Sequence, residues 1–167
     1  CTAFVGVLDL RTGHLQYCNA GHNPPVVITS ERETSFLSVK PNLAMGLWEG
    51  FEYQEQECGI EKGTNIFLYT DGVNEAENIT KELYGDDRLL QFLSKHFKRK
   101  PRNIVEELYN DIKLHSKDAE QNDDITMLCF TMLENLPKSD YSKRLVMRND
   151  IADIALMAEF IETLCDE

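Results

Sequence analysis

Apolar and polar positions follow two different periods along the chain, and the change between them predicts its elements. In the first part, apolar residues either alternate with polar ones or form short runs, which is typical of strands. The strands predicted in this way are Thr2–Leu10, His14–Asn19, Val26–Thr29, Ser35–Val39, Phe51–Glu57, Asn65–Tyr69 and, much later, Ile125–Met132. Arg11-Thr12-Gly13 predicts a hairpin turn, with glycine at the position of positive φ.

Between these last two strands, apolar residues recur every three or four positions. Asp87–Phe97 and Pro101–His115 are therefore predicted to be amphipathic helices, with Pro101 suited to a first turn. Strands, then two helices, then a final strand indicate a layered α+β fold with antiparallel strands. The sequence has neither G-x-G-x-x-G nor a Walker loop, which argues against a nucleotide-binding parallel sheet.

A polar, proline-containing stretch predicts a boundary after residue 133. We expect a domain over residues 1–133, a linker over 134–142 and a strand-helix tail over 143–167. In the tail, Lys143–Met147 reads as a strand, and Asp150 can cap a helix over Ile151–Cys165. One strand and one helix cannot bury their own apolar faces, so the tail packs on the domain, on another chain or on residues beyond Glu167.

Charge and composition exclude several classes of partner. With 167 residues and a formal net charge of -12, the chain has no basic stripe to replace the counterions of a nucleic acid. No apolar run approaches the roughly 20 residues of a membrane span, so we expect a soluble, cytoplasmic domain without membrane contact from this segment. The five cysteines are scattered without a C-x-x-C pair, which predicts buried, reduced thiols rather than disulfides or a zinc cluster.

Two acidic segments stand at the ends of predicted strands. Asp71-Gly72 follows Asn65–Tyr69, and Asn122-Asp123-Asp124 precedes Ile125–Met132. Carboxylates held at strand ends are the oxygen ligands that Mg²⁺ and Mn²⁺ prefer. Each segment by itself is better explained as a solvated turn, because Asp-Gly and Asn-Asp-Asp are common turn sequences.

Several motifs follow one another in an order typical of one family. They are Leu8-Asp9-Leu10 with Thr12-Gly13, Asn19-Ala20-Gly21-His22-Asn23-Pro24-Pro25, Leu43-Ala44-Met45-Gly46-Leu47, Tyr69-Thr70-Asp71-Gly72-Val73-Asn74-Glu75-Ala76, Tyr84-Gly85 with Arg88-Leu89, and Asp123-Asp124-Ile125-Thr126. Together they resemble the bacterial stage-II-sporulation-E-type branch of the 2C-class (PP2C) metal-dependent protein phosphatases, over residues 1–133.

The resemblance implies a fold, a cofactor and a reaction. The fold is an α-β-β-α sandwich of two antiparallel sheets flanked by helices, here lacking its first strands and helices. The cofactor is a binuclear Mn²⁺ or Mg²⁺ centre, whose metal-bound water attacks phosphoserine or phosphothreonine without a catalytic side chain. Asp71 and Asp123 match the metal ligands of the family, and Asp124 matches a residue just outside them or at an outer metal site.

Smaller roles are expected for other motif residues. Gly72 would form the tight turn that aims the preceding aspartate. Asn19 and His22 would tie the turn between them by hydrogen bonds, with proton donation by His22 as a weaker alternative. Glu75 would orient metal-bound waters, start a helix or lie at the surface, and Asp9 is expected to form a turn rather than bind metal.

The family also carries an earlier Gly-Asp-x-x-Asp segment whose first aspartate bridges both metals, and this sequence has none before Asp71. We therefore expect a fragment of a longer protein that is poorly active alone. The implied substrate is a phosphorylated regulatory protein, an antagonist of an anti-sigma factor. The alternative is a non-catalytic interaction module in signalling. The tail over 143–167 resembles the start of a histidine-kinase-like ATPase domain, and a packing or homodimer-forming helix explains it equally well.

Overall fold

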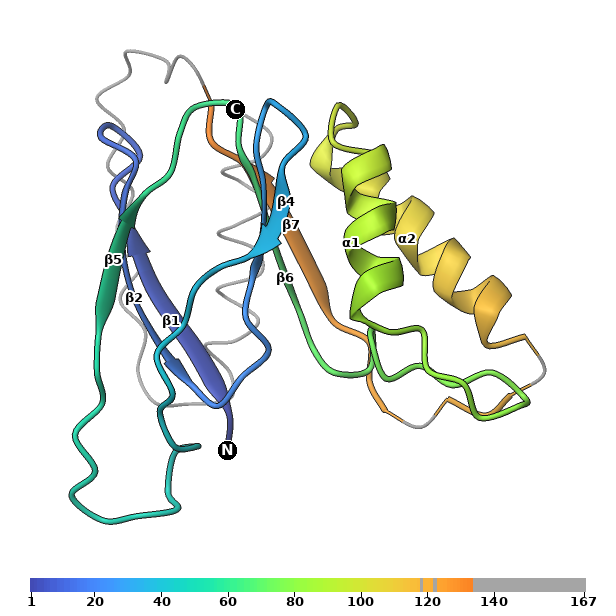
Figure 1. Cartoon of the computed structure of the whole chain (residues 1–167), viewed down its shortest axis with the longest axis horizontal. Coiled ribbons are helices and arrows are strands. Elements are labelled where there is room, and N and C mark those ends of the chain that lie inside the picture. Colours follow the sequence, from blue (N-terminus) through green and yellow to red (C-terminus); the bar gives the residue numbers. More distant parts are fainter. Residues whose placement is uncertain (118, 122, 134–167) are drawn as a thin grey trace, which may run out of the picture. The chain divides into compact units, whose positions relative to one another are not determined.

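The computed structural model describes residues 1–117, 119–121 and 123–133 (Figure 1). Its strands are β1 (Ala3–Leu8), β2 (His14–Ala20), β3 (Val26–Ile28), β4 (Thr34–Phe36), β5 (Gln56–Gly59), β6 (Asn65–Tyr69) and β7 (Met127–Thr131). Its helices are α1 (Asp86–Lys95) and α2 (Pro101–His115). The linker and tail predicted for 134–142 and 143–167 lie outside the described residues.

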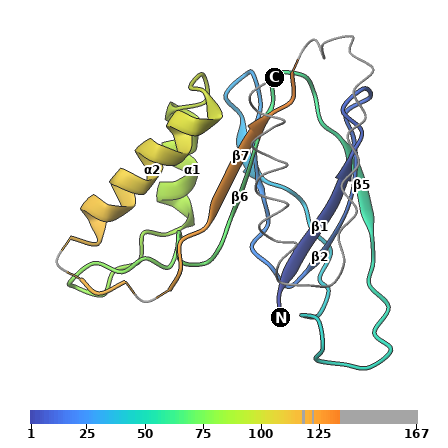
Figure 2. The ribbon, with the colours of Figure 1, turned by 180° about the vertical axis from the view of Figure 1, so that it is seen from behind.

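The strands form two sheets in which every neighbouring pair is antiparallel. One sheet has the order β1-β2-β5 and the other the order β4-β3-β6-β7. Both helices lie on the outer side of the four-stranded sheet, away from the three-stranded one (Figures 1 and 2). There α1 contacts β3 and β4, and α2 contacts β7. The predicted α+β architecture with two antiparallel sheets is confirmed.

The hairpin between β1 and β2 forms as the sequence predicts. Gly13 has a φ of 75°, and a Cβ at this residue would lie 2.2 Å from the carbonyl oxygen of Ile60. The Asp9 carboxylate accepts a hydrogen bond of 2.8 Å from the backbone N–H of Arg11. Asp9 is therefore a turn former, as expected.

The prediction of a strand over Phe51–Glu57 is wrong in its bounds, because β5 spans Gln56–Gly59. Ahead of β5, the backbone is paired with a side chain instead of a strand. Asn42 Oδ1 accepts a hydrogen bond of 2.9 Å from the N–H of Gln54, and Asn42 Nδ2 donates one of 3.1 Å to the Gln54 carbonyl. The other elements predicted within residues 1–133 overlap the observed ones and differ only at their ends.

The four-stranded sheet carries an apolar core on each face. The core under the helices consists mainly of side chains from β3, β6, α1 and α2: Val26, Ile28, Phe67, Tyr69, Val73, Tyr84, Leu89, Leu93, Ile104, Leu108 and Ile112. The core between the sheets consists of Leu15, Tyr17, Leu37, Ile60, Ile66 and Met132. Because β6 contributes to both cores, nearly all of it is buried, as its apolar run from Ile66 to Tyr69 predicts.

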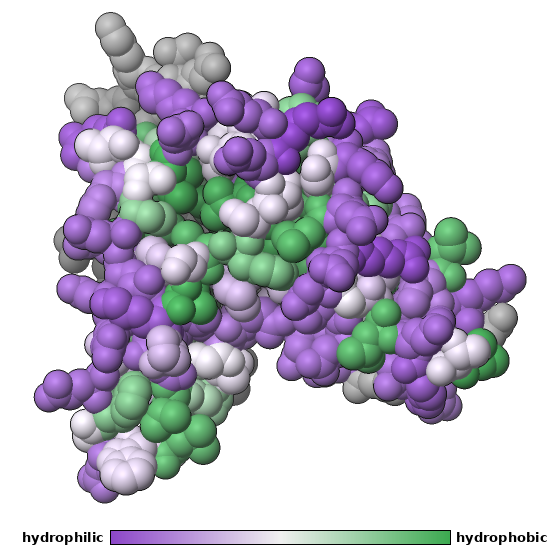
Figure 3. Space-filling model, in the orientation of Figure 1, coloured by the Kyte–Doolittle hydropathy of each residue, from purple (hydrophilic) through white to green (hydrophobic). Residues whose placement is uncertain are grey.

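Apolar side chains also gather outside these two cores (Figure 3). Between the sheets, residues of β1, β2, β3, β6 and β7 line a cavity of about 240 Å³. On the loop between β4 and β5, Leu47 and Trp48 are 70% and 73% exposed.

Two expectations from composition can be compared with the described part of the chain. Cys1, Cys18, Cys58 and Cys129 are free thiols, as predicted, while Cys165 lies outside the described residues. The prediction that these thiols are buried is wrong for the four described ones, because Cys1 is exposed and the other three are only partly buried. Among the described residues, no helix has the length and apolar character needed to cross a membrane.

Candidate metal centre

The antiparallel pairing of β6 and β7 brings the two acidic segments together. Since Tyr69 is paired with Met127, the residues after β6 and the residues before β7 lie at the same end of the sheet. Thr70 joins them directly. Its backbone N–H donates to the Thr126 carbonyl (3.1 Å), and its hydroxyl donates to the Asp124 carbonyl (2.9 Å) and accepts from the Thr126 N–H (3.0 Å).

Gly72 allows these two segments to approach each other closely. A Cβ on Gly72 would lie 2.5 Å from the carbonyl oxygen of Asp124 and 3.2 Å from that of Asp123. Its φ lies outside the left-handed region, so the turn itself does not require glycine. Glycine is needed here for backbone contact, a reason that the sequence did not reveal.

The acidic side chains at this edge are exposed. One Asp71 carboxylate oxygen accepts a hydrogen bond of 3.1 Å from the Gly72 N–H, and one of Asp123 accepts 2.7 Å from the Asp124 N–H. Within the described residues, no lysine, arginine or histidine forms an ion pair with Asp71, Glu75, Asp123 or Asp124. Their oxygens are therefore available to a hard divalent cation.

The carboxylate oxygens at this edge are of the kind that Mn²⁺ and Mg²⁺ prefer, but they are too few to complete a metal site. In the described part of the chain, no group of three or more His, Cys, Asp or Glu side chains is placed to hold a metal ion. Asp71 and Asp123 by themselves therefore offer part of a centre, and any cation that they hold needs water or further ligands.

The Asn19–His22 turn has the hydrogen bonds that its sequence suggests. Asn19 Nδ2 donates to the His22 carbonyl (2.7 Å), and the His22 N–H donates to Asn19 Oδ1 (2.8 Å). His22 takes part in this turn through its backbone. Its ring Nδ1 instead lies 3.3 Å from the hydroxyl of Thr2. A role of the ring in proton transfer stays untested.

Sequence reasoning missed a link between this turn and the acidic edge. Asn23 Nδ2 donates a hydrogen bond of 3.1 Å to Asn74 Oδ1, and Asn74 Nδ2 donates one of 2.8 Å to Asp86. Nearby, burial and then the charge of Asp86 raise the pKa of Tyr69 to about 12. Asn23 and Asn74 belong to the motifs quoted above, but nothing local in the sequence pairs them.

Glu75 starts no helix, because α1 begins at Asp86. It is exposed, and its N–H donates to the Asp71 carbonyl (2.8 Å). It also lines a cavity of about 440 Å³ beside the acidic edge, together with Gly72, Asp123 and two lysines from the end of α2 and just beyond it, Lys113 and Lys117. The surface expectation for Glu75 is met, and its contact with metal-bound waters stays a prediction.

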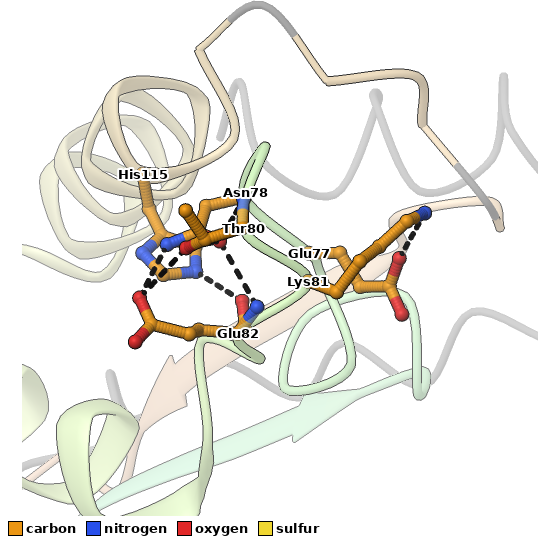
Figure 4. Close-up of polar contacts among 6 residues, drawn as sticks. All are labelled: Glu77, Asn78, Thr80, Lys81, Glu82 and His115. Carbon is orange, nitrogen blue, oxygen red and sulfur yellow. Dashed lines mark hydrogen bonds and ion pairs between the residues drawn. The ribbon is translucent and has the colours of Figure 1, made fainter.

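The loop that follows Glu75 is fixed by a polar cluster (Figure 4). Asn78 Oδ1 accepts from the N–H groups of Thr80 and Glu82, both at 2.9 Å, and Asn78 Nδ2 donates to the Glu82 carboxylate at 2.8 Å. His115 Nε2 lies 3.0 Å from the Glu82 carbonyl, which ties the loop to α2. The hydrogen bonds of Asn78 and Thr80 lower the pKa of Glu82.

Comparison with known proteins identifies the family. The model of the family "Stage II sporulation protein E (SpoIIE)" matches residues 1–133. The chain belongs to the SpoIIE family. Among its relatives, "Protein IcfG" of Synechocystis is 35% identical over 128 residues, which cover 76% of this chain and 20% of IcfG. "Phosphoserine phosphatase RsbU" of Bacillus subtilis is 24% identical over 127 residues, which cover 76% of this chain and 37% of RsbU.

A solved structure agrees with the fold of this SpoIIE-family chain. The crystal structure of the RsbU and RsbW domains of Rv1364c from Mycobacterium tuberculosis has a TM-score of 0.68 and 24% identity, and the match covers 81% of this chain and 38% of that one. The likeness shows a shared fold. The chain spans between a fifth and just over a third of the length of the curated relatives above, at 20% and 37%.

Proposed function

We propose that this chain contributes to a metal-dependent phosphatase that hydrolyses phosphoserine or phosphothreonine on a regulatory partner protein, with Asp71 and Asp123 as ligands of Mn²⁺ or Mg²⁺. The observation that carries the proposal is the meeting of the two acidic segments at one end of β6 and β7, joined by Thr70 and the close contact at Gly72. RsbU, a relative, is itself named a phosphoserine phosphatase, which supports this class of substrate.

The chain's own residues would bind the metal and hold its ligands in place. Asp71 and Asp123 offer exposed carboxylate oxygens, and Thr70 holds the two segments at a fixed separation through the Asp124 carbonyl. When bound, a divalent cation lowers the pKa of a water and neutralises phosphate charge. No side chain is needed as a nucleophile in this scheme.

A non-catalytic interaction module is the second candidate. It is favoured by the lack, among the described residues, of a group of three or more metal-ligating side chains. A module of this kind would keep the sheets and the apolar surface of the β4–β5 loop, and it would bind a partner without releasing phosphate.

Manganese binding and phosphate release separate the two candidates. We expect Asp71→Asn and Asp123→Asn each to weaken Mn²⁺ binding, measured by electron paramagnetic resonance, by about tenfold or more, which corresponds to about 1.4 kcal/mol for one lost ligand. When the same substitutions are made in the longer parent protein, its release of phosphate from a phosphoserine peptide at millimolar Mn²⁺ should fall in parallel.

The matched control is Asp87→Asn, which removes an exposed carboxylate from the first turn of α1. It should leave both measurements unchanged. Equal Mn²⁺ affinity in all variants would refute the metal assignment, and Mn²⁺ binding without any phosphate release by the longer parent protein would favour the interaction module.

A further inference from the structure

Asn74 stands at the centre of a hydrogen-bonded bridge between three parts of the chain. Its side-chain oxygen accepts from Asn23, in the connection between β2 and β3, at 3.1 Å. Its side-chain nitrogen donates to the carboxylate of Asp86, the first residue of α1, at 2.8 Å. Since a carboxylate only accepts hydrogen bonds, the orientation of the Asn74 amide is fixed by its partners.

The bridge fixes the far side of the turn that carries Asp71. Within this turn, the Val73 N–H donates to the Thr70 carbonyl (3.0 Å), and the Glu75 N–H donates to the Asp71 carbonyl (2.8 Å). The Asn74 carbonyl in turn accepts a hydrogen bond of 2.8 Å from the Gly85 N–H. Thr70 therefore anchors one end of the turn to the segment before β7, and Asn74 anchors the other end to Asn23 and α1.

The Asp71 carboxylate has little else to position it. It is exposed, and the hydrogen bond that it accepts comes from the next residue, Gly72, at 3.1 Å. Its place relative to Asp123 is consequently set by the backbone of the turn. A ligand has to be held within a fraction of an ångström to bind a metal well, so the anchors of the turn matter as much as the ligand.

We propose that Asn74 is a positioning residue, which holds the Asp71 turn at the acidic edge through the Asn23–Asn74–Asp86 bridge. Its importance for metal binding rests on the function proposed above. Asn74 acts through the turn and does not itself touch the metal or the substrate.

The asparagine at position 74 and the aspartate at position 86 can be exchanged for each other without losing the bridge. Asn74→Asp removes the donor and places two carboxylates against each other, which breaks the bond to Asp86. Adding Asp86→Asn restores a donor and an acceptor with their roles reversed, and Asn23 can still donate to the carboxylate at position 74. The double variant also has the same net charge as the original protein.

The first measurement follows the turn without metal. In Asn74→Asp, hydrogen exchange of the Val73 and Glu75 amides, measured by NMR, should become faster by about tenfold, the effect expected for one lost charge-assisted hydrogen bond. In the double variant, exchange should return to the original rate. Unchanged exchange in Asn74→Asp, or no recovery in the double variant, would overturn the proposal.

The second measurement is Mn²⁺ affinity of the same proteins. By charge alone, Asn74→Asp would attract Mn²⁺ more strongly, whereas loss of positioning weakens binding by about tenfold and the double variant recovers it. Asn110→Asp, on exposed α2 surface, is the control for added charge. Tighter binding in Asn74→Asp would contradict positioning. If the original protein binds no Mn²⁺ while the exchange pattern holds, the proposed metal function fails and not the bridge.

Discussion

A single missing methyl group decides how closely the two acidic segments meet. At Gly72, the backbone of one segment touches the backbone of the other, and the nearest atoms to an added Cβ are carbonyl atoms of Asp124. The Asp124 carbonyl, which accepts a hydrogen bond from the Thr70 hydroxyl, cannot move aside as the end of a flexible side chain can. The identity of this residue is therefore tied to the geometry of the candidate centre.

We predict that Gly72→Ala lowers the free energy of unfolding by about 1–3 kcal/mol, the range for forcing extra volume into a packed site. Urea unfolding followed by circular dichroism measures this change. The matched control is Gly59→Ala in β5, where an added Cβ would meet nothing within 4 Å. An equal effect of the two substitutions would contradict the close contact at Gly72.

At the scale of elements, the segment between β6 and α1 has no regular secondary structure, apart from an isolated bridge between Glu77 and Leu83, and is held by side chains. The cluster of Asn78, Thr80 and Glu82 satisfies the backbone of the loop, and His115 of α2 is joined to it. The pKa of Glu82 is lower in the folded protein than its ordinary value of 4.5, first because Asn78 and then because Thr80 donate to its carboxylate. Ionised Glu82 therefore stabilises the fold.

The stabilisation of the fold by Glu82 depends on pH. Because folding lowers the pKa of Glu82, its stabilisation is present above about pH 4.5 and is lost as the pH falls through the folded value. We expect Glu82→Gln to be less stable than the original protein at pH 7 and equally stable near pH 3, as measured by urea unfolding. Glu52→Gln, on the exposed β4–β5 loop, should show no difference at either pH.

At the scale of the molecule, β6 joins the two apolar cores. Phe67 is fully buried beneath the helices, and Ile66, its neighbour, is 3% exposed between the sheets. Adjacent residues of a strand point to opposite faces, so one short strand supports both layers. Damage to either core should then weaken the same cooperative unit.

We predict that Phe67→Ala lowers the free energy of unfolding by about 3–5 kcal/mol and Ile66→Ala by about 2–5 kcal/mol. Leu128→Ala, in neighbouring β7, is the control, since Leu128 is 57% exposed and should lose less than about 1 kcal/mol. Chemical denaturation with two probes, fluorescence and circular dichroism, should give one shared transition for each variant. Separate transitions would mean that the cores unfold independently.

The sequence by itself determined the order and type of most elements. Period-two segments became strands and period-three-to-four segments became helices, because the period records which side of an element is buried. The motifs from Leu8 to Thr126 also predicted the two-sheet fold of the SpoIIE family. The Phe51–Glu57 strand failed because its backbone partner is the side chain of Asn42, which periodicity does not record.

The tertiary structure decided everything that depends on which strands are neighbours. Pairing of β6 with β7 places Asp71 beside Asp123, gives Thr70 its partner at Asp124 and explains Gly72 by contact rather than by conformation. The bond between Asn23 and Asn74 likewise joins residues that are 51 positions apart. Local sequence fixes which side of an element is buried, whereas hydrogen bonds across such separations arise only after the sheets have assembled.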